Sequence, residues 1–267
     1  MDYTSSDFEK AFLSCGLKKG DSIFLTTSLG MLGTLKLEKK KLQINIIAKI
    51  LLDSLLKIIG KNGNIFVPTY SYSFRKLSKK KNYTFSTKNT KSLIGYFPNF
   101  FLKQKGCIRS IDPMVSVAGI GKKCEYVLKK ISYTSYGKNC VFERLLKIKD
   151  MQCCNVGLGV NWIPFIHYLD WINKVPFRYD KFFEGLIIDG KIKKKVRWHY
   201  PVRISRKETM SDGYKIGKLA LKEKLFKYHK LGKSKVYVIN YKKFFYFAKF
   251  LTSKNKWLTV NGPKFKS

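Results

Sequence analysis

Two titratable residues three positions apart, His167 and Asp170, are the strongest candidates for chemistry in this 267-residue sequence. Their segment, PFIHYLDWINKV, predicts a helix, so both side chains can share one face. A carboxylate beside a histidine holds the ring tautomer and stabilises the protonated form, which makes a general base for an amine or hydroxyl nucleophile. The alternative is a helix histidine that only packs. His199 and His229 have less context for a catalytic role.

A second candidate group follows the predicted strand GDSIFL. Thr26, Thr27 and Ser28, with Leu29 after them, occupy a loop that leads into a predicted helix. Hydroxyl groups and free backbone N–H groups at such a place suit a phosphate or a carbonyl oxygen. The alternative is a helix cap rich in serine and threonine. The chain has neither a Walker A pattern nor G-x-G-x-x-G, so ordinary nucleotide-hydrolysing and dinucleotide-binding functions lack support.

A third group lies in the small-residue segment GCIRSIDPMVSVAGIG, residues 106–121, which contains Arg109, Ser110, Asp112 and Ser116. A turn of this composition lets backbone approach a ligand closely, and the arginine suggests that the ligand is anionic. A carboxylate at Asp112 accepts hydrogen bonds or pairs with a cation at neutral pH. Its partner is either the ammonium of a substrate or a basic side chain such as Arg109.

The elements that must position these groups alternate along the chain. The first 70 residues predict helix, strand, loop, helix and strand, with the long helix over 37–59 and a strand that Pro68 stops. Residues 70–90 predict a long surface loop. A β-rich insertion with an Asp-Gly hairpin signal is expected around 183–206. No linker or internal repeat divides the sequence, so we expect one α/β domain over 1–267.

Charge and composition limit the function classes. The formal net charge is +37, and seven of the 54 basic residues are arginines, which leaves 47 lysines. This excess is either a solvated lysine-rich surface or a field that attracts anionic ligands. A basic nucleic-acid-binding protein lacks support because no reader motif is present, so we expect no specific nucleic-acid partner.

The cysteines and apolar segments indicate the compartment. Six cysteines show no C-x-x-C pair and no regular spacing, which argues against zinc and against a disulfide framework and favours a reducing cytoplasm. The acidic N-terminus is not typical of a signal peptide. In the longest apolar region, LQINIIAKILLDSLLKIIG, a polar stripe recurs every fourth residue, which predicts a largely buried soluble helix and no membrane span.

The order of four segments resembles the aminoglycoside 3-N-acetyltransferase family. GDSIFLTTSLGMLG resembles the family's opening motif, and GKNGNIFVPTYSYSF resembles its G-x-x-G-T-hydrophobic-P-T strand. GCIRSIDPMVSVAGIG is similar to its G-V-x-R-S-x-H-P segment, and NVGLGVNWIPFIHYLDW is similar to its segment L-G-V…H-x-x-E. The similarity covers roughly Gly20 to Arg203.

The resemblance implies acetyl-CoA-dependent N-acylation of an amino sugar on a three-layer α/β/α fold with a mixed central sheet, without a metal. His167 matches the family's catalytic histidine, and Asp170 stands where the family has glutamate. The residues that the motifs place around the two ligands are, for acyl-CoA, Thr26, Thr27, Ser28, Leu29, Arg109, Ser110 and Ser116, and, for the substrate, Thr69, Tyr70 and Asp112. Backbone N–H groups of the loop over 26–28 would stabilise the oxyanion.

Several positions depart from the family pattern. Thr26 and Asp112 replace family histidines, while Asn99 and Leu102 replace the acidic residue and the arginine of an E-x-F-R helix. These changes bear on the substrate more than on acyl transfer. Aminoglycosides are polycations, and a chain with 17 acidic against 54 basic residues would repel them.

We therefore expect an anionic, nucleotide-linked amino sugar destined for a surface glycan, a branch that PFRYDKFFEG (176–185) also suggests. A true aminoglycoside acetyltransferase that confers resistance is one alternative. An inactive family member acting as a binding or scaffold protein is another, and a homodimer is left open.

Overall fold

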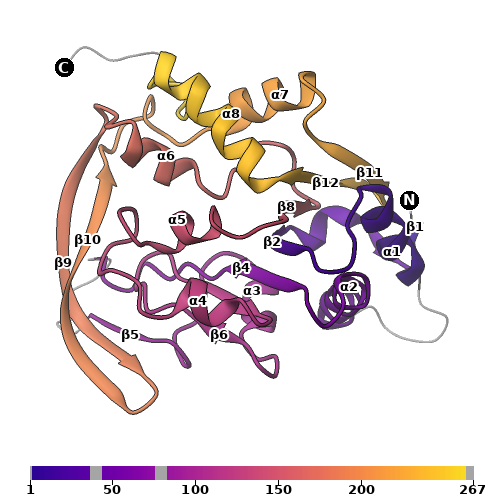
Figure 1. Ribbon diagram of the computed structural model, residues 1–267, viewed down its shortest axis with the longest axis horizontal. Coiled ribbons are helices and arrows are strands. Elements are labelled where there is room, and N and C mark those ends of the chain that lie inside the picture. Colours follow the sequence, from indigo (N-terminus) through magenta and orange to yellow (C-terminus); the bar gives the residue numbers. More distant parts are fainter. Residues whose placement is uncertain (1, 37–43, 76–82, 263–267) are drawn as a thin grey trace.

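A mixed seven-stranded sheet forms the centre of the computed structural model, which describes residues 2–36, 44–75 and 83–262 (Figure 1). Its strand order is β11-β12-β8-β2-β4-β7-β6. The three central strands, β2, β4 and β8, run parallel to one another, and the outer strands are antiparallel to their neighbours. The bounds are Ser22–Thr27 (β2), Asn64–Pro68 (β4), Ile108–Arg109 (β6), Val117–Ile120 (β7), Met151–Val156 (β8), Lys227–Leu231 (β11) and Ser234–Asn240 (β12).

Helices cover both faces of this sheet, which gives the three-layer α/β/α arrangement expected from the sequence. One buried cluster packs α1 (Ser5–Ser14), α2 (Ile44–Ile59) and α3 (Tyr96–Phe101) against one face. The other cluster includes residues from the helices of the opposite face. These are α4 (Cys124–Leu128), α5 (Val141–Leu145), α6 (Ile166–Ile172), α7 (Tyr214–Lys222) and α8 (Tyr241–Lys254). The central strands are buried on both sides, which explains their continuous apolar sequences.

The β-rich region forms a long hairpin of β9 (Arg178–Asp189) and β10 (Ile192–Arg203), with twelve residue pairs in register. Figure 1 shows it curving along one side of the molecule. The short strand β5 (Thr84–Ser86) pairs with β9 and completes a three-stranded sheet. Gly185 allows close packing here, since a Cβ on it would lie 2.5 Å from the Phe74 ring. The hairpin thus lies directly against the segment that follows β4.

Several boundaries differ from the sequence predictions for local physical reasons. The first helix, α1, begins at Ser5, and Thr4 caps it through a capping box with Asp7. The described part of the long helix begins at Ile44, and 37–43 lie outside the described residues. The loop predicted over 70–90 contains β5, while 76–82 lie outside the described residues.

A few short elements complete the structure. The segment 106–121 contains two short antiparallel strands, β6 and β7, joined by a turn. A 3₁₀ turn, η1 (Leu29–Leu32), follows β2, and β1 (Asp2–Tyr3) pairs with β3 (Thr34–Leu35). The sequence pattern did not predict α5, α7 or β11.

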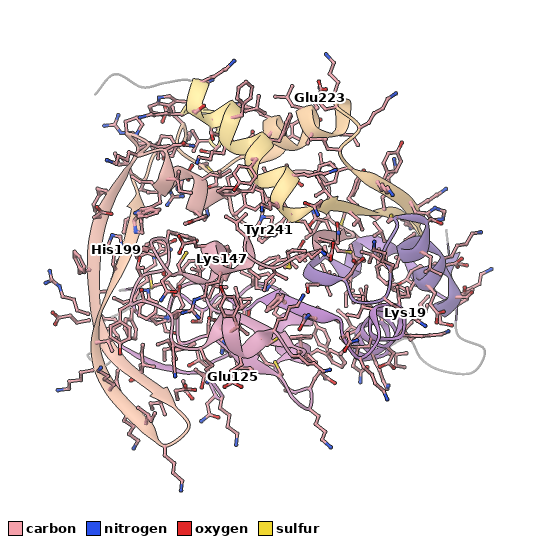
Figure 2. All side chains as sticks on the ribbon, in the orientation of Figure 1. Lys19, Glu125, Lys147, His199, Glu223 and Tyr241 are labelled. Atoms are coloured by element: carbon pink, nitrogen blue, oxygen red, sulfur yellow. The ribbon has the colours of Figure 1, made fainter. Side chains whose placement is uncertain are left out.

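Charged side chains project from the surface in every direction in Figure 2, whereas Tyr241, the first residue of α8, is fully buried. All six cysteines are free thiols. Over the described ranges, no helix combines the length and apolar character needed to cross a membrane.

Candidate active site

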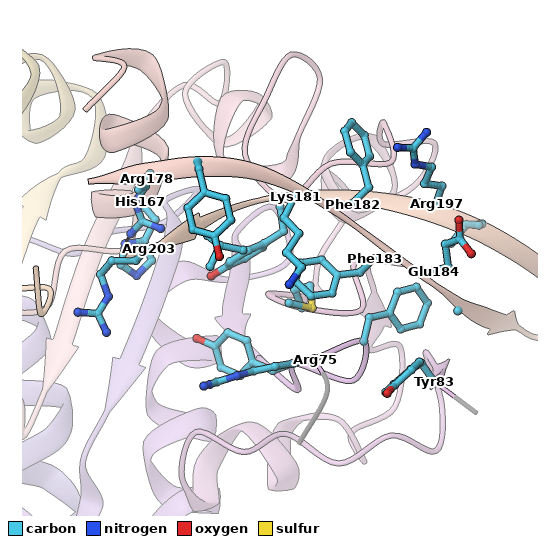
Figure 3. Close-up of a pocket in the computed structure, with 18 of the residues that line it drawn as sticks. Arg75, Tyr83, His167, Arg178, Lys181, Phe182, Phe183, Glu184, Arg197 and Arg203 are labelled. Atoms are coloured by element: carbon cyan, nitrogen blue, oxygen red, sulfur yellow. Dashed lines mark hydrogen bonds between the residues drawn. The ribbon is translucent and has the colours of Figure 1, made fainter. Parts of the chain in front are cut away.

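A cleft of about 1460 Å³ lies between the β9–β10 hairpin and the segments that follow β4 and β8 (Figure 3). Tyr72, Phe74 and Arg75 enter it from the segment after β4, and His167 enters it from α6 after β8. In α/β sheets the carboxyl ends of parallel strands are the usual place for ligands, because the chain leaves the sheet there and opens a crevice. The hairpin forms the opposite wall.

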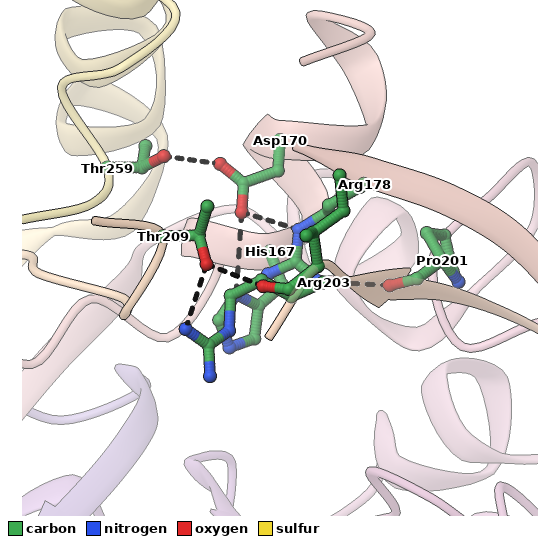
Figure 4. Close-up of polar contacts among 8 residues, drawn as sticks. His167, Asp170, Arg178, Pro201, Arg203, Thr209 and Thr259 are labelled. Carbon is green, nitrogen blue, oxygen red and sulfur yellow. Dashed lines mark hydrogen bonds and ion pairs between the residues drawn. The ribbon is translucent and has the colours of Figure 1, made fainter. Parts of the chain in front are cut away.

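His167 and Asp170 lie together at one end of this cleft, as their spacing on α6 predicts (Figure 4). The two groups differ in exposure: the imidazole is 24% exposed, and the carboxylate is 1% exposed. Asp170 Oδ1 accepts a hydrogen bond from the Thr259 hydroxyl at 2.6 Å. Asp170 Oδ2 lies 3.6 Å from His167 Nδ1, which is too far for a good hydrogen bond.

Arg178, the first residue of β9, lies between the two. Its Nε donates to Asp170 Oδ2 at 2.8 Å, and one terminal nitrogen donates to His167 Nδ1. Its other terminal nitrogen donates to the Pro201 carbonyl at 2.9 Å. A guanidinium has no acceptor, so Nδ1 must hold its lone pair toward Arg178. In this arrangement the neutral imidazole carries its proton on Nε2.

The electrostatic setting keeps His167 neutral at physiological pH. Burial lowers the pKa of its imidazole, and the positive charge of Arg178 lowers it further, while Asp170 acts in the opposite direction. Asp170 itself keeps a lowered pKa: burial opposes ionisation, but His167 and Arg178 outweigh it. The cluster is therefore an ionised carboxylate and a guanidinium beside a neutral histidine.

Tyrosines surround the imidazole on the cleft side. The Tyr136 ring meets the His167 ring edge to face with centroids 5.8 Å apart, and it also packs on Tyr200 at 5.6 Å. Burial raises the pKa of the Tyr72 hydroxyl well above its usual value, and burial also raises the pKa of Tyr200. Tyr72 and Tyr200, which line the cleft, therefore stay protonated at neutral pH and can donate hydrogen bonds into it.

The charged lining of the cleft is almost entirely basic. Its only carboxylate among the described residues is Glu184. The cationic residues are Arg75, Arg178, Lys181, Lys195, Arg197 and Arg203. Of these, only Arg178 has a carboxylate partner within 4.0 Å in the described part of the chain.

Arg109, expected to bind an anion, is instead committed to the protein interior. It is 4% exposed, and its nitrogens donate to the Thr69 and Thr90 carbonyls and to the hydroxyls of Thr69 and Ser116. Ser116 donates to the Thr69 carbonyl, and Ser110 accepts from the Val117 N–H. These contacts hold the turn against β4, and no nitrogen of Arg109 faces the cleft.

Asp112 also makes its hydrogen bonds within the protein, and the expected contact with substrate stays a prediction. Its side chain is buried, and Oδ1 accepts from the backbone N–H groups of Met114 and Val115 and from the Ser135 hydroxyl. No ion pair with Arg109 forms. Thr69 and Tyr70 are buried as well, and neither lines the cleft, whereas Tyr72 and Met114 do.

The hydroxyl loop after β2 also lies outside this cleft lining. Thr26 is buried and donates to Asn155 Oδ1 at 2.6 Å, and Leu29 belongs to the core. Thr27 and Ser28 are half-buried. The Ser28 N–H, considered for an oxyanion, donates to the Val156 carbonyl at 2.8 Å. Its hydrogen bond continues the β2–β8 pairing.

Residues missed by the sequence reasoning supply most of the cleft chemistry, namely Tyr72, Arg75, Arg178, Lys181, Tyr200 and Arg203. The sequence contained one indication of these residues: arginine is scarce in this chain, and Arg178 lies in the segment PFRYDKFFEG, residues 176–185. In the described ranges, no three His, Cys, Asp or Glu side chains are grouped to hold a metal ion.

Comparisons with known proteins agree with this architecture. The model of the aminoglycoside 3-N-acetyltransferase family matches residues 28–252. The aminoglycoside acetyltransferase AAC(3)-Xa has a similar structure, with a TM-score of 0.79, 14% identity and coverage of 97% of this chain and 94% of that one. No curated protein sequence matches significantly.

Two further structures share the fold. AAC-IIIb in a binary complex with CoASH has a TM-score of 0.79 at 14% identity, with 99% of this chain and 100% of that one covered. The YokD protein from Bacillus subtilis has a TM-score of 0.76 at 16% identity, with 94% and 100% covered. At these identities the likeness establishes the fold.

Proposed function

This chain belongs to the aminoglycoside 3-N-acetyltransferase family, and we propose that this acetyl-CoA-dependent N-acetyltransferase acetylates the amine of an anionic amino sugar. The acceptor we favour is linked to a nucleotide and destined for a surface glycan. The observation that carries the anionic character is the lining of the cleft beside His167, with six cations and one carboxylate.

Charge complementarity separates this acceptor from an aminoglycoside. A polycation entering this cleft would face unpaired guanidinium and ammonium groups and would find few carboxylates to replace its lost water contacts. Asp170 cannot serve, because it is buried and already bonded to Arg178 and Thr259. An acceptor that carries phosphate meets the opposite situation and would be attracted.

The size of the cleft suits two ligands. Its volume of about 1460 Å³ exceeds the roughly 300–1,000 Å³ of an ordinary single-ligand pocket. Acetyl-CoA, the acyl donor that the family implies, is itself anionic and fits the same basic lining. Binding both molecules side by side makes the transfer an oriented reaction, which contributes much of the rate enhancement.

His167 serves as the general base in this proposal. The role requires a lone pair on Nε2, which the ring has when Nδ1 carries the proton and donates it to Asp170. This tautomer forms when the terminal nitrogen of Arg178 leaves Nδ1 and the 3.6 Å separation from Asp170 Oδ2 shortens. Nε2 then accepts the proton from the ammonium or from the developing amide nitrogen of the acceptor.

Thiol release from acetyl-CoA tests the proposal. The acceptor panel contains nucleotide-linked amino sugars, the same amino sugars without phosphate, and kanamycin. We expect release with a nucleotide-linked acceptor and a loss of that release in His167→Ala. Faster release with kanamycin than with any anionic acceptor would refute the substrate class. Tight CoA binding without release for any acceptor would favour the binding or scaffold alternative.

A further inference from the structure

Arginine is concentrated in the cleft beyond what the composition of the chain predicts. The whole chain has 47 lysines and seven arginines, yet the cleft is lined by four arginines and two lysines. A general excess of positive charge would have placed lysines there. Arginine offers a planar fork of donors that fits phosphate oxygens two at a time, which an ammonium does not. The positive charge of the cleft is therefore carried mainly by arginine, unlike the positive charge of the whole chain.

Three of these cations share one part of the cleft. Arg75 extends from the segment after β4, Lys181 from β9, and Arg203 from the end of β10 (Figure 3). Figure 3 shows them projecting into the space between the hairpin and the Arg75 segment, with Arg203 the nearest of the three to His167. Burial lowers the pKa of Arg203, and the positive charges of Arg178 and Arg75 lower it further, so these guanidiniums are near enough to repel one another.

Nothing in the described part of the chain neutralises this group. Among the described residues, Arg75, Lys181 and Arg203 have no carboxylate within 4.0 Å, and the hydrogen-bond partner of Arg203 is the Thr209 hydroxyl, at a long 3.4 Å. Glu184 pairs in register with Arg197, which is six residues from Arg203 along β10, or about 20 Å. Three like charges held together without a counterion raise the electrostatic energy of the free protein.

We propose that Arg75, Lys181 and Arg203 form a phosphate-binding subsite of the cleft, which takes a phosphate ester or diphosphate of one of the two reactants. The inference rests on the proposed function for the identity of those reactants, but the subsite stands on its own contacts. A phosphate carries up to two negative charges and presents several acceptor oxygens, so it matches two guanidinium forks and an ammonium.

Two sources can supply that phosphate: the amino-sugar acceptor or the CoA part of the acyl donor. Competition distinguishes them without any turnover. If inorganic pyrophosphate occupies the subsite and CoA then binds with an unchanged Kd, the subsite belongs to the acceptor. If pyrophosphate raises the Kd of CoA, the subsite belongs to the donor.

The test measures pyrophosphate binding by calorimetry at low ionic strength. The double variant Arg75→Met with Arg203→Met should weaken binding by at least about tenfold, since a hydrogen bond to a charged group contributes at least one such factor. The matched control is Lys242→Met with Lys249→Met, two exposed residues of α8, an element that contributes nothing to the cleft lining. It removes the same total charge and should leave binding nearly unchanged.

The replaced side chains make few contacts, so both variants should fold, which thermal unfolding will verify. Arg203→Lys is a second probe, because it keeps the charge but loses the fork and should weaken binding by an intermediate factor. Equal weakening in the double variant and its control would overturn the proposal, as would absence of pyrophosphate binding to the wild-type protein. Pyrophosphate binding without thiol release would instead sustain the subsite and count against the proposed reaction.

Discussion

Removal of Arg178 should reverse the sign of the pH dependence that His167 contributes to the stability of this protein. Arg178→Met deletes the bonds from the guanidinium to Asp170 and to His167. Asp170 is then a buried carboxylate whose remaining polar neighbours are Thr259 and, 3.6 Å away, the imidazole. The imidazole loses the positive charge that depresses its pKa and keeps the carboxylate that raises it.

The size of the effect follows from burial of both partners. The side chains of Arg178 and Asp170 are 5% and 1% exposed, and removing one member of such a pair costs about 3–5 kcal/mol. For a protein of this size each kcal/mol corresponds to about 2–4 °C in Tm, so Tm should fall by about 6–20 °C at alkaline pH. Protonated His167 can partly replace the lost cation at acidic pH.

The sign follows from proton linkage. In the wild type, the folded-state pKa of His167 lies below the unfolded value of about 6.5, so this group's contribution to stability is full above that pH and is lost as pH falls. In Arg178→Met we expect the folded pKa to exceed the unfolded one. The contribution is then full below about pH 6.5 and is lost as pH rises through the new pKa.

Thermal unfolding at about pH 5.5 and about pH 8 measures the difference, and NMR titration of the imidazole signals measures the pKa directly. The chain has three histidines, so a His167→Gln variant assigns the resonance. Arg197→Met is the matched control, because Arg197 is exposed and stacks on Phe182 at 4.2 Å from the ring centroid. An equal loss of Tm at both pH values, with an unmoved His167 signal, would refute this account.

Three other outcomes are expected. His167→Ala should lower kcat by about 10²–10⁴ while calorimetry still detects CoA binding; near-normal turnover would remove His167 from the mechanism. Asp112→Ala should lower the free energy of unfolding in a denaturant titration by about 2–4 kcal/mol, because three hydrogen bonds converge on Oδ1; Asp112→Asn keeps that acceptor and should cost less than about 1 kcal/mol. Burial raises the pKa of Asp112 to about 6, above the value in the unfolded chain. The contribution of this group to wild-type stability should therefore fall as the pH rises from about 4 to about 6, and that slope should vanish in Asp112→Asn. Expression in a sensitive bacterium should leave kanamycin and gentamicin resistance unchanged, and a clear rise would contradict the charge argument.

The fold was predictable where local signals and burial agree. The central strands are apolar runs ended by turn formers, and α2 ends before Gly60 as its sequence indicates. Two of the elements that were missed are short or lack periodicity: α5 has five residues, and β11 is the lysine-rich sequence KYHKL. Their structure depends on packing and pairing with distant segments, which no local pattern encodes.

The site was predictable only within one element. His167 and Asp170 are three residues apart on α6, so a helical period is enough to bring them together. Arg178 joins them from a different element, β9, and its position depends on how the hairpin leaves the body of the protein. The local sequence around Arg109 indicated an anionic ligand. It could not show the hydrogen-bond partners Thr69 and Thr90, because they are 40 and 19 residues away along the chain.

Six of the seven arginines fall into two groups by what their guanidinium groups contact, and this division explains why the net charge of the chain was a weak guide to the site. Arg109 and Arg144 direct their nitrogens at protein oxygens; Arg144 alone reaches three backbone carbonyls and the Asn139 side chain. A lysine could satisfy neither set, because one ammonium cannot span acceptors in that planar array. In a chain whose surface is otherwise lysine-rich, arginine thus marks places where donor geometry matters. The cleft contains four such residues, and only Arg178 among them has a carboxylate partner in the described structure. Interior arginines find their acceptors within the chain, whereas the other cleft arginines find none among the described residues apart from the 3.4 Å contact of Arg203 with Thr209. Phosphate is the ligand group whose geometry matches the fork they present.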